Sequence, residues 1–408
     1  MLREFIVRHK ERWRFLKPAW LAYRRVLGAI PWRWLPVSSR VIGPPKGFHA
    51  TTADYLAGAA ADPRDRVHPI APARTLEYPA PHGRDAAEHW KFRQFARQSV
   101  PAASVFELHD VRLWGDYAGT LIGRDDRVLG DLTRDVWEVQ CHRIFTRLKL
   151  PPCRRLSGTT AVLTTAEADR NYWHWTLELL PRLNRLERAG FAPADFDWYV
   201  INHRDRGYER ESLEQLGVKW ERVVRADAHL HVELERAVTA SLKSHQYAVT
   251  AEDVAFLRAM AVAQWPAAKP HRRLYLSRSG AGFRRLQNEA EVLAVLEPLG
   301  FEVVRGETLS VAGQQRAFRE AAVVVGPHGS ALANAIYCQR DTKVLEFMSP
   351  RYIDLAMWAG SSAAGLEHWV LFGEGPRPPE GVDPMARQQD IAINVGSLRE
   401  TLRAMQLC

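Results

Sequence analysis

Strand and helix patterns alternate regularly between residues 272 and 347 of this 408-residue chain. Four apolar segments have the length and composition of strands: RRLYLSR (272–278), FEVVRG (301–306), AVVVG (322–326) and KVLEF (343–347). Helical patterns separate them at 288–300, 310–321 and 331–337. Nearly continuous apolar strands between helices are typical of a parallel sheet that is covered on both faces. The pattern therefore predicts a doubly wound α/β fold for this half of the chain.

The N-terminal half has a less regular pattern. Between residues 104 and 165, short apolar runs are interrupted by Asp and Gly, which predicts β-hairpins. Residues 61–84 are rich in Pro, Ala and Arg and predict irregular structure. Pro266 and Pro270 mark a linker before the regular α/β part. We expect four units: an arm at 1–46, an N-terminal domain at 47–266, a C-terminal domain at 267–375, and a tail at 376–408 that packs back, with a strand at 391–394 and a final helix.

The net charge of +9 is confined to the first 46 residues, which hold eleven Lys and Arg but only two Glu. The rest of the chain is neutral, which does not favour a body that binds nucleic acid. In the arm, Trp13, Leu16, Trp20, Tyr23 and Leu27 are spaced three or four residues apart, so they share one helical face. An amphipathic helix with basic flanks is typical of segments that lie on an anionic membrane surface. Packing on the protein's own body and nucleic-acid binding are the alternatives for this arm.

Three absences in the sequence limit the class of protein. There is no run of 18 apolar residues, and the N-terminus lacks the apolar core of a signal peptide. The four Cys residues form no CxxC pair, so neither a disulfide framework nor a cysteine zinc site is expected. This use of cysteine fits a reducing compartment.

The segment NYWHWTLELLPR (171–182) carries the first candidate site. On a helix, Asn171, His174 and Glu178 would share one face. A His and a carboxylate four residues apart can act as a base and its partner if a cleft lies above them. Pro181 would weaken the helix at this point, which is a cost that needs a reason. The alternative is a structural His–Glu pair on a core helix.

A basic loop after the strand at 272–278 is the second candidate site. Arg278 ends the strand, and Arg284 and Arg285 follow in a loop that contains two Gly. Arginines around such a loop, at the carboxyl end of a strand, suit a phosphate or a diphosphate. The loop matches neither the Walker pattern nor GxGxxG. A solvated basic loop is the alternative.

The third candidate site follows the strand at 322–326, where His328, Gly329 and Ser330 precede a helix. Small residues let a ligand approach the backbone, and a helix N-terminus favours anions. Glu346, in the strand at 343–347, would lie at the same edge of the sheet and could bind the hydroxyl pair of a ribose. A salt bridge at the sheet edge is the alternative for this carboxylate.

Two further pairs of residues match metal-binding patterns weakly. Asp195 and Asp197 form a DxD sequence, but it precedes a strand, whereas a DxD that binds a metal should follow one. His229 and His231 can face one side of a strand but lack a third ligand. We therefore expect no metal at either pair.

The ordered set of these motifs resembles glycosyltransferase family 61, whose bacterial members are often described as capsular polysaccharide biosynthesis proteins. The similarity covers roughly residues 43–400 and is most specific from 171 to 347. The segments that carry it are GPPKGF (43–48), NYWHWTLELLPRLNRL (171–186), RRLYLSRSGAGFRRLQNEAEV (272–292), GFEVVRGETLSVAGQQRAF (300–318), AAVVVGPHGSALANAIY (321–337), KVLEF (343–347) and IAINVGSL (391–398).

The resemblance implies a GT-B-like fold, in which two Rossmann-like domains face a cleft and the C-terminal half binds the donor. It implies an inverting glycosyltransferase that uses a nucleotide-sugar donor and needs neither a metal nor another cofactor. Members commonly have Ala at position 330, so Ser330 departs from the pattern at a donor contact. The implied roles are general base for Glu178 with His174 beside it, support of the acceptor side for Asn171 and Arg182, and donor binding for Arg278, Arg284, Arg285, His328, Gly329, Ser330, Asn334 and Glu346.

The expected function is transfer of a hexose or pentose to a glycan or lipid-linked acceptor during assembly of a surface polysaccharide, such as capsule, LPS or exopolysaccharide. Eukaryotic members carry a membrane anchor that this sequence does not show. We therefore expect a bacterial cytoplasmic enzyme, held on the inner face of the cytoplasmic membrane by residues 1–46, with no nucleic-acid partner. The alternatives are a nucleotide-sugar hydrolase or phosphotransferase, and a non-catalytic nucleotide- or carbohydrate-binding protein.

Overall fold

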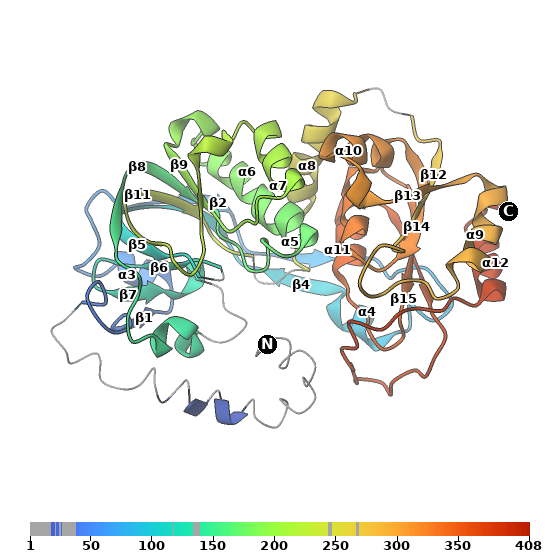
Figure 1. Ribbon diagram of the computed structural model, residues 1–408, viewed down its shortest axis with the longest axis horizontal. Helices are drawn as coiled ribbons and strands as arrows, with labels where there is room; N and C mark the ends of the chain where they lie inside the picture. The colour runs from blue at the N-terminus through green and yellow to red at the C-terminus, as the bar shows by residue number, and fades with distance from the viewer. Residues whose placement is uncertain are drawn as a thin grey trace.

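The computed structural model contains two large β-sheets with a group of helices between them (Figure 1). It describes residues 18–20, 22–23, 26, 38–116, 118–133, 139–243, 247–266 and 269–408. A mixed sheet of nine strands forms the N-terminal half, and a parallel sheet of five strands forms the C-terminal half. The chain is therefore α/β, as the sequence predicts. The amphipathic helix predicted from Trp13 to Leu27 lies largely outside the described residues.

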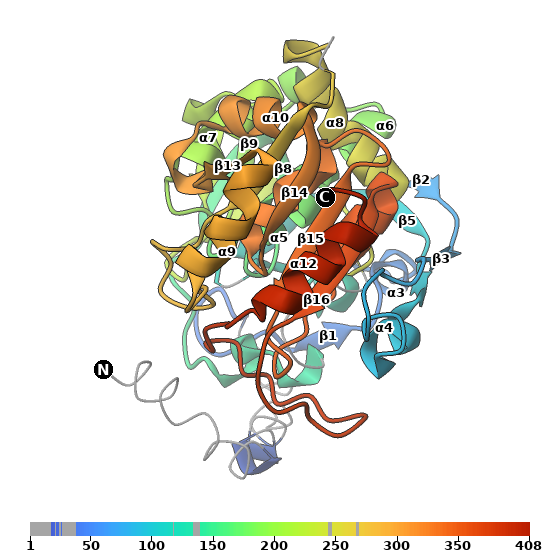
Figure 2. The same ribbon diagram turned by 90° about the vertical axis from the view of Figure 1, so that its right-hand side faces the viewer.

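The five strands of the C-terminal sheet are covered by helices on both faces. In spatial order the strands are β13 (Phe301–Val304), β12 (Arg272–Leu276), β14 (Ala321–Pro327), β15 (Lys343–Met348) and β16 (Glu367–Phe372). The helices are α9 (Glu289–Leu296) and α12 (Val395–Ala404) on one face (Figure 2), and α10 (Val311–Arg319) and α11 (Ala356–Ala364) on the other. Val323 and Val325 pack towards the first pair and Val324 towards the second, because successive side chains of a strand alternate. The doubly wound parallel sheet predicted from the sequence is confirmed.

The strand order creates a topological switch point between β12 and β14. After β12 the chain adds β13 on one side, and then returns to add β14, β15 and β16 on the other side. Ligands of open α/β sheets bind beyond the carboxyl ends of the strands at such a point. Arg278 lies shortly after β12, and His328 lies directly after β14. The fold therefore places two of the sequence-predicted candidate residues at the switch point.

The N-terminal sheet combines antiparallel hairpins with a parallel part. Strands β5, β6 and β7 pair antiparallel, so the hairpins predicted within residues 104–165 are present. Strands β11, β8, β9 and β10 pair in parallel, and β11 joins the two parts by pairing antiparallel with β5. The strands are β1 (Gly47–His49), β2 (Arg66–Ala71), β5 (Ala103–Trp114), β6 (Thr120–Ile122), β7 (Arg127–Leu129), β8 (Arg154–Val162), β9 (Trp198–Ile201), β10 (Val223–Arg225) and β11 (His231–Ala240). The helices of this half are α3 (Thr52–Leu56), α4 (Trp90–Phe95), α5 (Tyr172–His174), α6 (Leu180–Arg188), α7 (Gly207–Gln215) and α8 (Ala251–Gln264).

Two local predictions from the sequence are wrong. Residues 61–84, expected to be irregular, contain β2 and β3 (Arg74–Glu77), which pairs with β4 (Arg97–Val100). Pro69 obscures the strand pattern of β2, but β2 pairs with β5 alone and has a register irregularity beside Pro69, where a residue without an N–H is tolerated. Residues 391–394, expected to form a strand, make only an isolated bridge, between Ile391 and Leu286.

A segment from the N-terminal half of the sequence packs on the C-terminal sheet. Within residues 78–95, His82 lies beside β16: its N–H donates to His368 O at 2.8 Å, and its carbonyl accepts from Val370 N at 2.9 Å. One hydrophobic core also runs from α5 and α6 to α10 and α11. The boundary that the sequence suggests at residue 266 therefore runs through segments that share a core.

Residues 38–46, the last part of the predicted arm, are held against the N-terminal sheet. Ser39 is buried; its backbone N donates to Asp126 Oδ2 at 2.8 Å, and its hydroxyl contacts the same carboxylate and Arg112. Lys46 N donates to Asp126 O at 2.7 Å. This part of the arm is therefore built into the body. Among the described residues, no helix combines the length and the apolar character that crossing a membrane requires.

Candidate functional site

Arg278 is half-buried at the switch point. Its guanidinium donates to two backbone carbonyls, Phe283 O at 3.1 Å and Arg284 O at 3.3 Å. Within the described part of the chain, no carboxylate forms an ion pair with it. Burial, together with the charge of Arg284, lowers the pKa of Arg278 to about 10. This cation thus lacks the counter-ion that normally accompanies a desolvated charge.

Arg284 is a second partly desolvated arginine in the same loop. It has a φ of 55°, in the left-handed region that is uncommon for residues other than Gly. Its guanidinium lies 5.3 Å from the centre of the Tyr352 ring and donates to Arg387 O at 3.4 Å. Burial lowers its pKa, and no described carboxylate forms an ion pair with it. Two neighbouring guanidiniums without counter-ions are what a diphosphate or a similar anion requires.

Arg285, the third arginine predicted for this site, points elsewhere. Its side chain is exposed and donates to Asp390 Oδ2 at 2.9 Å. Its backbone N donates to the same carboxylate at 2.9 Å. The structure therefore brings Arg278 and Arg284 together but pairs Arg285 with the C-terminal tail.

The ring of His328 is oriented by a buried carboxylate. Its Nδ1 donates to Glu346 Oε1 at 2.5 Å, and His368 Nε2 lies 3.2 Å from Glu346 Oε2. Burial raises the pKa of Glu346, but the two histidines outweigh it, so the pKa lies below its ordinary value. With Nδ1 engaged, Nε2 is the ring atom left to face a ligand. Glu346 is fully buried, with one carboxylate oxygen against the ring of His328, and the ribose contact stays a prediction.

Gly329 and Ser330 bring the backbone close to Arg278. A Cβ atom at position 329 would lie 2.7 Å from Arg278 Cζ, which is closer than real side chains approach. Ser330 begins η10 (Ser330–Tyr337), a 3₁₀ helix where the sequence predicts an α-helix. The guanidinium of Arg278 therefore packs against the turn that leads into η10, and this contact depends on Gly at position 329.

Asn334 lies within η10 and is fully buried. Its amide donates to Gln314 Oε1 at 2.6 Å and accepts from the Tyr172 hydroxyl at 2.8 Å. Tyr172 belongs to α5, so these bonds join η10 to the helix that carries the first candidate site. The structure thus places Asn334 as a link between the two sites, with both ends of its amide engaged, instead of at a surface open to a ligand.

The first candidate site lies on one helical segment with three parts. Asn171 is the N-cap of α5, because its side chain accepts from Trp173 N at 2.9 Å. A π-helical turn, η5 (Trp175–Leu179), follows, and then α6 with Pro181 in its first turn. Pro181 has no N–H, and its ring excludes a bond to the carbonyl four residues earlier, that of Leu177. The wider π-helical turn accommodates this proline and places Glu178 within the turn.

Lys243 binds the carbonyl that Pro181 leaves without a helical partner. Its ammonium donates to Leu177 O at 2.6 Å and lies 2.9 Å from Asp253 Oδ2. Burial raises the pKa of Asp253, but Lys243 and Arg185 outweigh it, so the pKa lies below its ordinary value. This buried ion pair therefore supports the π-helical turn from the side of α8.

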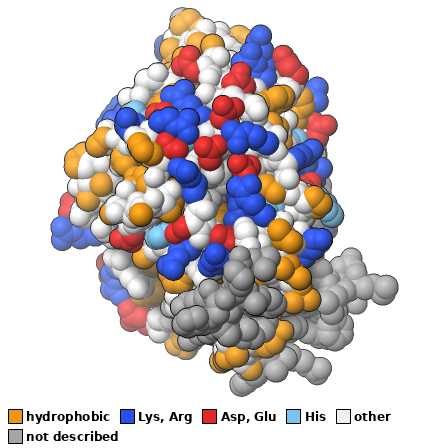
Figure 3. All heavy atoms as spheres, turned by 90° about the vertical axis from the view of Figure 1, so that its left-hand side faces the viewer, with side chains coloured by type: hydrophobic (Ala, Val, Ile, Leu, Met, Phe, Trp, Pro, Cys, Tyr) orange, Lys and Arg blue, Asp and Glu red, His pale blue; other side chains and the backbone are white. Residues whose placement is uncertain are grey.

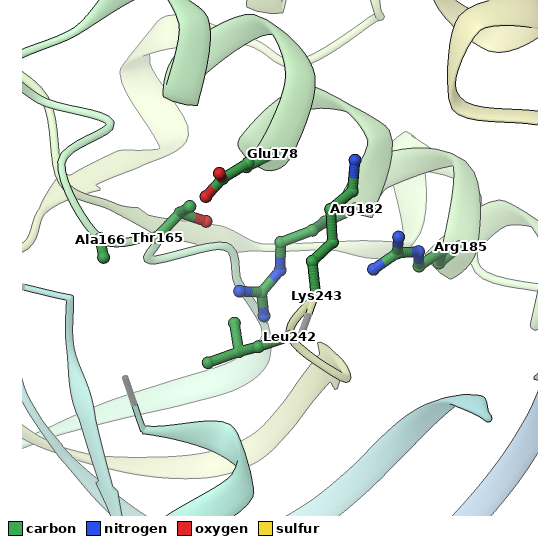
Figure 4. Close-up of a pocket in the computed structure, with 7 residues that line it drawn as sticks. All are labelled: Thr165, Ala166, Glu178, Arg182, Arg185, Leu242 and Lys243. Carbon is green, nitrogen blue, oxygen red and sulfur yellow. The ribbon is translucent and has the colours of Figure 1, made fainter. Parts of the chain in front are cut away.

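Glu178 is almost fully buried beside His174. A distance of 3.1 Å separates Glu178 Oε1 from His174 Nδ1, and their side chains are 4% and 14% exposed. The Glu178 carboxylate points into a small pocket, towards Thr165 and the guanidinium of Arg182 (Figure 4). The predicted His–Glu pair is thus present at the wall of a pocket. The cavity volume is only about 10 Å³, so a single hydroxyl-sized group fits beside the carboxylate, and such a group could give it a proton.

The guanidinium of Arg182 is engaged by the N-terminal sheet. It donates to Thr164 O at 2.8 Å, Ala240 O at 2.9 Å, Val162 O at 3.1 Å and Thr239 Oγ1 at 2.6 Å. Burial, together with Arg185, lowers the pKa of Arg182 to about 9. Arg182 therefore fastens α6 to β8 and β11 and forms a wall of the pocket.

Sequence reasoning missed three charged residues of this pocket region, Arg185, Lys243 and Asp253. They come from three separate segments: α6, the chain after β11, and α8. Arg185 has a signal, because it follows Arg182 by three residues on a helix and must lie near it. Lys243 has only an indirect signal: Pro181 leaves a carbonyl that needs a donor from elsewhere.

The weak metal-binding patterns have structural explanations. Asp195 accepts from a backbone N–H of its own turn, and Asp197 Oδ2 accepts from Thr159 N at 2.8 Å. His231 is buried, with its Nδ1 2.8 Å from Pro151 O. Across the described ranges, no three His, Cys, Asp or Glu side chains are grouped as metal ligands.

Replacing Lys243 by Met should destabilise the protein, because it removes the partner of Leu177 O and breaks a buried ion pair. We expect a loss of about 3 kcal/mol in the free energy of unfolding. Urea unfolding followed by circular dichroism measures it. Lys219→Met, at an exposed position, is the control and should change little. Equal stability of the two variants would contradict the role given to Lys243.

The comparison with protein families agrees with the resemblance seen in the sequence. The family model described as Glycosyltransferase 61 matches residues 172–345. The matched segment runs from the first residue of α5 into β15, so it contains Glu178, Arg278 and His328. No curated protein matches the chain. Residues 172–345 are thus a glycosyltransferase family 61 segment, and the chain is a glycosyltransferase.

Proposed function

We propose that the enzyme transfers a hexosyl or pentosyl group from a nucleoside diphosphate sugar, with inversion at the anomeric carbon and without a metal. The observation that carries this proposal is the pair of arginines, Arg278 and Arg284, which lie at the switch point of a parallel sheet and form no direct ion pair with a carboxylate of the described residues. A diphosphate leaving group develops negative charge as its bond to the sugar breaks. Two guanidiniums placed in advance can stabilise that charge.

Glu178 is the general base in this proposal. It takes the proton of an acceptor hydroxyl, whose oxygen attacks the anomeric carbon while the bond from that carbon to the diphosphate breaks. The electron pair of the broken bond leaves with the nucleoside diphosphate. His174, 3.1 Å from the carboxylate, holds it in place. The cations Arg182 and Lys243 line the same pocket as this carboxylate.

The two reacting groups must meet, and the packing of α5 on η10 supports this. The Tyr172 hydroxyl donates to Asn334, and the Trp173 ring lies against Gly360 of α11, where an added Cβ would be 3.0 Å from the ring. The segment with the base thus abuts the helix that begins at the donor loop. We propose that the two sheets form the halves of a GT-B-like enzyme, with the donor on the five-stranded sheet.

The proposed acceptor is a glycan or a lipid-linked glycan of a surface polysaccharide. The basic residues of the arm and its Trp positions support an anionic membrane surface as the place where the enzyme meets it. Each basic residue near such a surface contributes ~1 kcal/mol, so the arm has enough charge for binding. In this proposal the enzyme is bacterial and lies on the cytoplasmic side of the membrane.

Replacing Gly329 by Ala should displace the Arg278 guanidinium and weaken donor binding. A lost charge-assisted hydrogen bond is worth ~1.5–3 kcal/mol, so the Kd for a nucleoside diphosphate should rise at least about tenfold. Isothermal titration with UDP, GDP, CDP and dTDP measures it. Thermal stability should change little, because the displaced group is the flexible end of a side chain. Gly207→Ala, where an added Cβ meets nothing, is the control; unchanged affinity in Gly329→Ala would contradict the proposal.

Replacing Glu178 by Gln should abolish most of the transfer while leaving donor binding intact. A general base contributes typically ~10²–10⁴-fold to the rate, and kcat should fall by that factor. The assay follows glycoside product from a panel of nucleotide sugars, and its product analysis separates transfer from hydrolysis. Glu187→Gln is the matched control, because Glu187 is exposed on the same helix. Transfer at the parent rate would exclude Glu178 as the base.

Removing residues 1–37 should release the enzyme from anionic vesicles. The truncation keeps Ser39, whose contacts with Asp126 belong to the body. Co-sedimentation with phosphatidylglycerol vesicles should fall to the level seen with phosphatidylcholine, while transfer to a soluble acceptor continues. Undiminished sedimentation of the truncated enzyme would show that the arm packs on the body or serves another purpose.

A further inference from the structure

An open groove lies at the carboxyl ends of β15 and β16, outside the two candidate sites. Its cavity volume is about 200 Å³, which is less than the ~300–1,000 Å³ usual for sites that enclose a drug-sized ligand, so it suits a small ligand. His89 and Trp90, at the start of α4, form one side. Phe372, the last residue of β16, forms another, and Pro350 and Ile353 lie after β15. The groove thus exists because the segment at 78–95 crosses onto the C-terminal sheet.

The groove borders the arginine site. Ile353 lines it, and the preceding Tyr352 has its ring 5.6 Å from the ring of His328 and 5.3 Å from Arg284 Cζ. The buried ammonium of Lys91, in α4, donates to Ile353 O and fixes α4 to this edge. A ligand in the groove would therefore lie next to whatever Arg278 and Arg284 bind.

The charges around the groove are compensated, unlike those of the arginine site. Arg93 lies 2.5 Å from Glu380 and 3.8 Å from Glu88, and Arg377 lies 2.7 Å from Asp85. The Glu88 and Glu380 side chains are nevertheless 85% and 73% exposed, so their oxygens remain open to further hydrogen bonds. A neutral ligand with several hydroxyl donors suits such a rim better than an anion does.

The floor of the groove is aromatic. The His89 ring centre lies 5.8 Å from that of Trp90 and 5.7 Å from that of Phe372. Burial, with the charges of Lys91 and Arg377, lowers the pKa of His89, while Asp383 opposes this. This shift favours the neutral imidazole. Together these rings form a surface with apolar faces and a few polar edges.

We propose that this groove binds a neutral pyranose ring of the acceptor glycan. The C–H face of the sugar packs on the rings of Trp90 and Phe372, and its hydroxyls donate to Glu88 and Glu380. The assignment rests on the proposed function, because it takes the acceptor to be a glycan that approaches the donor at Arg278. A glycan acceptor also accounts for the position of this aromatic groove, which borders the proposed diphosphate site at Arg278 and Arg284.

The nucleoside of the donor is a poorer match for the groove than a neutral sugar. A nucleotide brings phosphate charge, but Arg93 and Arg377 at this rim are already paired with carboxylates, whereas sugar hydroxyls can donate to Glu88 and Glu380. Saturation-transfer NMR on the full-length protein without donor separates these ligands. The probes are the methyl glycosides of glucose, galactose, mannose, xylose and N-acetylglucosamine, and the nucleosides uridine, guanosine, cytidine and thymidine.

We expect saturation transfer to at least one methyl glycoside, and its loss in Trp90→Ala with a Kd at least about tenfold higher. Trp90→Phe keeps an aromatic face and should retain binding. Trp198→Ala is the control, because Trp198 is also half-buried but lies on β9. Circular dichroism establishes that each variant is folded, and if Trp90→Ala is not, the comparison uses Trp90→Leu.

Three results would overturn the assignment: no transfer to any of the glycosides, equal transfer in the Trp90 variants that lack an aromatic ring, or transfer to a nucleoside that depends on Trp90. Binding of nucleoside diphosphates should be the same in Trp90→Ala and the parent protein. A failure of the proposed donor site would appear separately, as absent nucleoside diphosphate binding in the parent protein, so the two proposals can fail independently.

Discussion

The bond from Lys243 to the carbonyl of Leu177 is the interaction on which the position of the candidate base depends. Pro181 prevents a regular helix at this point, and the π-helical turn that results carries Glu178 towards the pocket. The turn is tolerated because the ammonium of Lys243, itself paired with Asp253, binds the Leu177 carbonyl, which Pro181 cannot bind. A regular helix without Pro181 would need no lysine there, and it would place Glu178 differently. Pro181 thus both prevents a regular helix and sets the position of Glu178.

The buried and half-buried charges of this molecule are of two kinds, those paired with an opposite charge and those without such a pair. Asp253 and Glu346 are buried carboxylates whose cationic or histidine partners hold their pKa below its ordinary value, so both serve the fold by remaining charged. Arg278 and Arg284 are different, because they are partly desolvated and donate to backbone carbonyls of the described chain. Their pKa values are lowered accordingly. A protein tolerates such a cost where a ligand later supplies the missing charge.

The sequence predicted the C-terminal half well and the N-terminal half less well. Val323, Val324 and Val325 predict a buried parallel strand, because a strand in a sheet covered on both faces is a short continuous apolar run and β-branched residues favour strands. The edge strand β2 has no such mark, since Pro69 is compatible with an edge and its exposed residues need not be apolar. Among the site residues, the His174–Glu178 pair could be predicted from spacing, because two residues four positions apart on a helix are neighbours on the same face. It could not find Lys243, because contacts between distant segments leave no periodic signal.

Residues 78–95 cross from the N-terminal half onto the five-stranded sheet and so connect the two halves of the molecule. His82 continues the sheet beyond β16, and α4 then lies across the carboxyl ends of β15 and β16. An enzyme that joins two substrates needs surfaces from both halves around one reaction centre. Here a segment of the N-terminal half supplies Trp90 to a groove on the C-terminal sheet, while α5 brings Glu178 from the other side through its contact with η10. Since hydrogen bonds make both connections, relative movement of the halves would disturb the candidate base and the groove together.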